Sequence, residues 1–264
     1  MADSTTPTLQ RERSLILGGL LMLSALAWAL LIWQASTMSH QAMGLTMGMS
    51  ALLFMAVWIV MMVAMMFPTA APMILMFSAI SASKRKQERP FIPTWIFVSA
   101  YLLIWSLCGV VAYSLALEIE QLAAQSMWLM EHAARLGGVV LVVAGLYQLS
   151  PLKDICLSKC RTPFQFILSS WHDGYGGALR MGFEHGAYCL GCCWLLFVIL
   201  FPLGIMNLAV MALLTALIFA EKALPIGRPI SKRGFRRVDC LWSDRPVLAH
   251  CAPYGDELTG RQTG

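Results

Sequence analysis

The chain has 264 residues, of which 58% are hydrophobic and only 12% are charged, and its formal net charge is +5. Ordinary soluble domains contain about 25% charged residues, so this composition excludes both a soluble globular domain and an intrinsically disordered chain. A membrane-spanning helix needs about 20 predominantly apolar residues, and six such runs can be drawn. The sequence therefore predicts an all-α, polytopic membrane helix bundle of about six transmembrane helices.

The expected membrane domain covers residues 14–224, with a short tail at residues 1–13 before it. Pro68 and Pro72 lie in the second expected span, where proline kinks a membrane helix rather than ending it. Residues 225–264 are basic and lack a long apolar run, which predicts a disordered tail. The six expected spans are residues 14–33, 51–80, 91–117, 133–149, 177–201 and 205–220.

The basic residues predict the orientation of these spans, because Lys and Arg concentrate in cytoplasmic loops. If the N-terminus is inside, 18 of the 19 Lys and Arg residues fall on the cytoplasmic side, and only Arg135 falls outside. We therefore interpret the positive charge as a topology signal and expect no nucleic-acid partner. Both termini are predicted to be cytoplasmic, and the methionine-rich loop at residues 34–50 is predicted to face outside.

The fifth expected span carries a face of soft donor atoms. In an α-helix, each residue is rotated by about 100° from the one before it. Cys189 and Cys192 then lie on either side of His185, within about 60° of one another, and Cys193 lies about 80° from His185. Thiolate and imidazole ligands select Cu(I), Zn(II) or iron–sulfur centres. This clustering favours a metal site with these four residues as primary ligands. A redox dithiol and simple packing of small apolar thiols are the alternatives.

The second expected span contains four methionines within six residues, Met61, Met62, Met65 and Met66. Thioethers bind Cu(I) well and Zn(II) hardly at all, so these residues favour copper over zinc. They are interpreted as secondary ligands or a relay, with core filling as the alternative. The outer loop adds Met38, His40, Met43, Met47 and Met49, which either collect copper outside the membrane or form an interfacial turn.

Cys156 and Cys160 precede the fifth span on the expected cytoplasmic side. Their spacing puts both thiols on one side of the segment if it is helical. A stable disulfide is not expected in the cytoplasm. The pair is interpreted as a metal-exchange site or second soft site, with unpaired structural thiols as the alternative.

The chain resembles a bacterial family of predicted metal-binding integral membrane proteins that are often labelled copper chaperones. The resemblance covers roughly residues 14–224 and implies a metal role, with copper as the metal, in the bacterial cytoplasmic (inner) membrane. Family members usually continue past a Glu-Lys pair, here Glu221-Lys222, into another apolar helix. Residues 227–264 do not provide such a helix. The matching strings are Met61-Met-Val-Ala-Met-Met-Phe-Pro68, Cys156-x3-Cys160-Arg161-x-Pro163, Gly182-x2-His185-Gly186-x2-Cys189-x-Gly191-Cys192-Cys193-Trp194 and Glu221-Lys222.

These observations together predict an integral membrane protein that binds Cu(I) for copper delivery or transport, with a cuproprotein or a copper chaperone as recipient. Zinc is the less favoured metal. No Ser/His/Asp arrangement or paired carboxylates suggest a hydrolase, so the protein is expected not to be an enzyme. Two alternatives stay open: a membrane thiol/disulfide oxidoreductase that uses Cys192 and Cys193 or Cys156 and Cys160, and a structural membrane assembly subunit.

Overall fold

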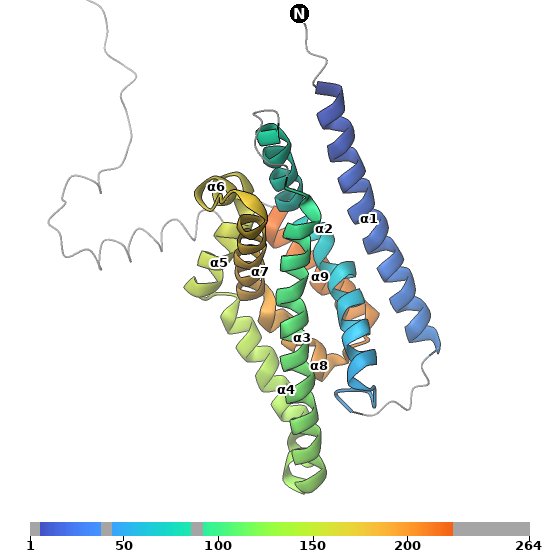
Figure 1. Cartoon of the computed structure of the whole chain (residues 1–264). Coiled ribbons are helices and arrows are strands. Elements are labelled where there is room, and N and C mark those ends of the chain that lie inside the picture. The colour runs from blue at the N-terminus through green and yellow to red at the C-terminus, as the bar shows by residue number, and fades with distance from the viewer. Residues whose placement is uncertain (1–5, 38–43, 86–91, 224–264) are drawn as a thin grey trace, which may run out of the picture. The chain divides into compact units, whose positions relative to one another are not determined.

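The computed structural model describes residues 6–37, 44–85 and 92–223, and these residues form helices and no strands (Figure 1). The expected all-α class is thereby confirmed. The expected tail at 225–264, together with Met38, His40 and Met43 of the outer loop, lies outside the described residues. The helices are α1 (Thr6–Thr37), α2 (Ala51–Arg85), α3 (Thr94–Gln125), α4 (Met127–Tyr147), α5 (Pro151–Arg161), α6 (Pro163–Ser169), α7 (Gly174–Val198), α8 (Leu200–Leu203) and α9 (Leu208–Ala223).

Five of these helical segments are long and apolar enough to cross a membrane: α1, α2, α3, α4 and α7, the last together with α8. Their outer surfaces are apolar as well; on α4, Val142 is 62% exposed and Leu146 is 64% exposed. Apolar surface of this extent is unfavourable in water and suits contact with lipid. The helices are therefore compatible with a membrane protein.

The boundaries agree with most of the expected spans and differ at two places. The sixth expected span, residues 205–220, corresponds to α9, which begins and ends three residues later and, like that span, has 16 residues, fewer than the roughly 20 that cross a bilayer. The connection expected around residues 118–135 is helical instead, because α3 and α4 meet at Ser126, whose side chain caps α4 by accepting from the Leu129 amide. The α2 helix continues through Pro68 and Pro72, as expected.

Helix α7 packs against α3, α4 and α5, while α2 packs against α1, α3 and α9. The close approach of α3 and α7 requires a small residue at Gly182, since a Cβ there would lie 2.5 Å from the Phe97 carbonyl oxygen. The Trp58 indole of α2 donates a hydrogen bond to the Trp105 carbonyl of α3 at 2.9 Å. Side chains of α2, α3 and α7 therefore share one buried core.

Candidate metal centre

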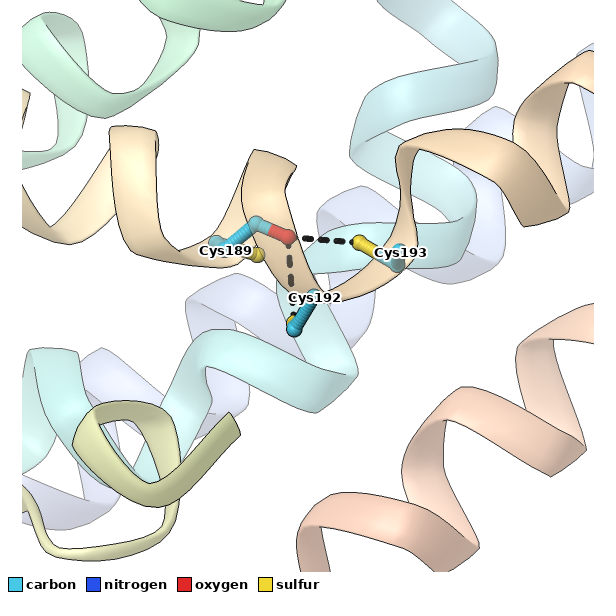
Figure 2. A group of neighbouring side chains, drawn as sticks. All are labelled: Cys189, Cys192 and Cys193. Atoms are coloured by element: carbon cyan, nitrogen blue, oxygen red, sulfur yellow. Dashed lines mark hydrogen bonds between the residues drawn. The ribbon is translucent and has the colours of Figure 1, made fainter. Parts of the chain in front are cut away.

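Three thiols of α7 form the centre of the site (Figure 2). The Sγ atoms of Cys189, Cys192 and Cys193 all lie within 4.8 Å of one another, and the three residues are at most 2% exposed. The thiols of Cys192 and Cys193 donate to the Cys189 carbonyl oxygen at 3.1 and 2.7 Å. The helical spacing thus gathers three soft donor atoms in a volume that one metal ion could occupy.

The sulfur of Cys189 also contacts two polar groups from other helices. The Tyr101 hydroxyl of α3 lies 3.3 Å from Cys189 Sγ. The Lys222 ammonium of α9 donates to Cys189 Sγ at 3.2 Å and to the Thr69 hydroxyl of α2 at 3.2 Å. The site therefore holds a built-in positive charge, and a metal ion bound at Cys189 would compete with Lys222 for the same sulfur.

The two cysteines of α5 lie beside the α7 thiols. Interactions with Cys189 and Cys192, together with burial, raise the pKa of the Cys160 thiol well above its ordinary value. The Cys156 sulfur packs on α7 so closely that a Cβ at Gly191 would lie 2.7 Å from it. Burial, and then the charge of Cys192, raise the Cys156 pKa as well. The structure therefore joins two groups of cysteines that the sequence analysis treated as separate sites.

A partly buried ion pair holds α9 against α5 next to this cluster. Lys153, which is 2% exposed, contacts the Glu221 carboxylate at 2.5 Å. The Arg161 guanidinium donates to the Glu221 carbonyl oxygen, also at 2.5 Å. Because Glu221 immediately precedes Lys222, this pair sets the position from which Lys222 reaches Cys189.

His185 is buried one helical turn before Cys189 but lies outside the group of three clustered thiols. Its ring stacks on Tyr101 and Phe97 with centroid distances of 5.3 and 5.8 Å, and Phe166 packs against it at 5.9 Å. Within the described part of the chain, neither ring nitrogen of His185 has a hydrogen-bond partner. An unpaired buried polar group is costly, so a His185 nitrogen is available to an ion or ligand among these aromatic rings.

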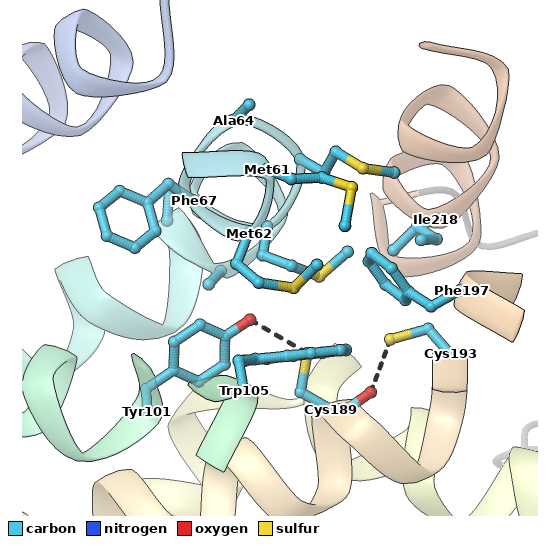
Figure 3. Close-up of a cluster of buried hydrophobic side chains, with 14 of the residues drawn as sticks. Met61, Met62, Ala64, Phe67, Tyr101, Trp105, Cys189, Cys193, Phe197 and Ile218 are labelled. Atoms are coloured by element: carbon cyan, nitrogen blue, oxygen red, sulfur yellow. Dashed lines mark hydrogen bonds between the residues drawn. The ribbon is translucent and has the colours of Figure 1, made fainter. Parts of the chain in front are cut away.

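The four methionines of α2 are all buried, with at most 1% of each residue exposed: Met61, Met62, Met65 and Met66. Met61 and Met62 reach from α2 towards Trp105, and Cys189 and Cys193 lie beyond that ring on α7 (Figure 3). The Thr69 hydroxyl lies 3.9 Å from the Met66 sulfur and also accepts from Lys222. The methionines therefore share one buried region with the thiols.

Sequence reasoning missed three residues of this site, Lys222, Thr69 and Tyr101. The Glu221-Lys222 pair does carry a signal, because two charged residues end an otherwise apolar helix. Tyr101 and Thr69 are not part of any charged or cysteine- or methionine-containing motif in the sequence. Only helix packing brings Tyr101 to Cys189 and Thr69 to Lys222.

Comparison with known proteins gives one match by family. The PpoB2 family, described as copper chaperone, matches residues 55–235, which include most of α2, all of α3 to α9, and every cysteine and methionine of the site described above. No curated protein and no solved structure matches the chain.

Proposed function

The chain belongs to the PpoB2 copper chaperone family, and from that membership we propose that it binds Cu(I) within a membrane and delivers the ion to a cuproprotein. The proposed primary ligands are Cys189, Cys192 and Cys193, with His185 beside them. Copper is the cargo of the protein, and no bond of an organic substrate is made or broken. We accordingly propose a binding and delivery protein and not an enzyme.

The observation that carries this proposal is the buried cluster of three thiols. Thiolates are soft ligands that select Cu(I), Zn(II) or iron–sulfur centres. The adjoining methionines favour Cu(I) within that set, since a thioether adds little affinity for zinc. Metal binding requires deprotonated thiols, so loading is expected to release protons.

The surroundings of the cluster support delivery over permanent storage. Cys160 of α5 already contacts Cys189 and Cys192, so an ion can change one thiol ligand for another in small steps. Lys222 can return to Cys189 when the ion leaves, because its ammonium is held 3.2 Å from that sulfur. An emptied thiolate would then keep a positive partner, which lowers the cost of release in a buried site.

Replacing Met61, Met62, Met65 and Met66 together with leucine tests the choice of metal. Leucine roughly preserves volume and apolarity but removes the thioethers. Under the copper proposal, the variant is expected to lose about tenfold or more in Cu(I) affinity, comparable to the loss of supporting groups around other metal sites. The measurement is competition with a Cu(I) chelator on the purified full chain.

The matched control replaces Met22 and Met130, which are both 60% exposed on α1 and α4, with leucine. These changes should leave the Cu(I) affinity as it is in the wild type. Unchanged Cu(I) affinity in the fourfold α2 variant would remove the methionines from the site and restore zinc as an equal candidate.

A further inference from the structure

A carboxylate of α3 fixes the segment that precedes α2. The Thr46 amide donates to Glu120 Oε1 at 2.6 Å, and the Thr46 hydroxyl lies 3.1 and 2.9 Å from the two carboxylate oxygens. Gly44 has a φ of 116°, and a Cβ there would lie 2.6 Å from Glu120 Oε1. Only glycine accommodates both conditions easily. Residues 44–46 are therefore anchored to α3.

This anchored turn places Met49 inside the protein. The Met49 amide donates to the Thr46 carbonyl at 3.0 Å, and the Tyr113 hydroxyl of α3 donates to the Met49 carbonyl at 3.4 Å. Met49 is 7% exposed, although it precedes the first residue of α2 by only two positions. The turn thus brings a buried thioether to the end of a candidate membrane span.

Met49 and Met61 line the same small cavity. Its other lining residues are apolar, apart from the Trp58 indole N–H, which already donates to the Trp105 carbonyl. Met49 and Met61 are the lining residues that carry a soft donor atom, and the cavity holds about one water-sized guest. The cavity is lined by Met49, Phe54, Val57, Trp58, Met61 and Ile205.

Such a lining discriminates strongly between ions. Thioether sulfur binds soft monovalent ions such as Cu(I) and Ag(I) and is a poor ligand for Mg²⁺, Ca²⁺ or Zn²⁺. The face of the Trp58 ring adds attraction for a cation. Neutral ligands leave the charge of the ion uncompensated, however, so the ion is held less tightly than by thiolates.

The cavity also adjoins the cysteine site. Met61 belongs to the buried cluster that contains Cys189, Cys193 and Phe197 (Figure 3). The Trp58 ring packs against Phe197 of α7 with 6.4 Å between ring centroids. The cavity lining and the thiols therefore belong to one continuous buried core.

We propose that Met49 and Met61 form a second Cu(I) site, an entry site that receives the ion at the α2 N-terminal end and passes it to the Cys189 cluster. This inference rests on the proposed function and adds the route by which the ion reaches the thiols. In the orientation that the basic residues favour, the entry site faces the outside of the cytoplasmic membrane.

Ag(I) titration of the full chain, with ¹³C-labelled methionine methyl groups observed by NMR, tests occupancy of this site. The methyl resonances of Met49 and Met61, assigned from the Met49→Leu and Met61→Leu spectra, are expected to shift in one common titration step. Met55 is the internal control, because it lies on α2 beside Phe54 and does not line the cavity. A Met49 resonance that stays in place while the cysteines bind Ag(I) would overturn the entry site and leave the proposed function intact.

The rate of Cu(I) loading tests the route. Met49→Leu is expected to slow filling of the cysteine cluster by about tenfold, since one of two soft ligands is lost from the path, with an unchanged final occupancy of the cysteine cluster. Met55→Leu should load at the wild-type rate. Equal rates in both variants would contradict the route, whereas a wild-type chain that binds neither Ag(I) nor Cu(I) would contradict the proposed function itself.

A second pair of variants tests the role of Glu120, which anchors the turn at residues 44–46. Glu120→Gln weakens the charge-assisted bonds to Thr46 and is expected to slow loading in the same direction as Met49→Leu. Glu118→Gln is the matched control on the same helix, because Glu118 is exposed. Equal slowing by both glutamine variants would show a general charge effect and contradict the role of the anchored turn.

Discussion

Cys189→Ser is expected to lower the Cu(I) affinity by about 100-fold or more, since even supporting residues around metal ligands are commonly worth 10- to 100-fold. Serine keeps nearly the same size but replaces a soft thiolate by a hard hydroxyl. Cys189 is the central sulfur of the site: its thiol is linked with Cys160, Cys192 and Cys193, and Lys222 contacts it. The measurement is Cu(I) affinity by chelator competition on the purified variant under reducing conditions.

Cys108→Ser is the matched control for this loss. Cys108 is a free thiol of α3 outside the group of clustered sulfurs, so its replacement should leave the affinity at the wild-type value. Equal losses in the two variants, or normal binding by Cys189→Ser, would show that the α7 thiols pack the core and do not hold the ion.

Glu221→Gln is expected to destabilise the folded chain by about 3 kcal/mol, because it leaves the Lys153 charge buried without its partner. The Lys153 side chain is only 3% exposed, and its ammonium pairs with the Glu221 carboxylate at 2.5 Å. The measurement is unfolding of the full chain in mixed micelles, followed by helical circular dichroism as the fraction of denaturing detergent rises.

Glu184→Gln provides the comparison for this prediction. Glu184 pairs with Arg180 at 2.9 Å in an exposed i, i+4 pair, and exposed pairs contribute about 0–1 kcal/mol. The two glutamine variants remove the same charge from very different surroundings. Equal stability of both variants would contradict the view that the Lys153–Glu221 pair fastens α9 to α5.

The sequence predicts local features of this fold well, because hydropathy and helical period are properties of short segments. The six apolar runs match six of the helices, and the angular spacing on α7 correctly brought Cys189, Cys192 and Cys193 to one face. The same spacing put His185 on that face, yet its ring stacks among aromatic residues of α3 and α6. The angle of a residue on its own helix does not specify what packs against it.

The remaining parts of the site depend on contacts between helices. Cys160 joins the α7 thiols because α5 packs along α7, and Lys222 reaches Cys189 because Lys153 and Arg161 hold the end of α9. Neither contact can be predicted from a helical period or a residue spacing, because each joins residues of two different helices. The sixth expected span, residues 205–220, has the length of α9 but is displaced by three residues, since apolar residues of the preceding turn were counted with the helix.

The metal content of the wild-type chain tests the central claim most directly. The full chain is purified under reducing conditions from cells grown with copper and zinc, and both metals are measured by elemental analysis. A three-thiol cluster beside buried methionines predicts bound copper in at least stoichiometric amount and little zinc. A chain that carries zinc instead of copper, or neither metal, would contradict the account.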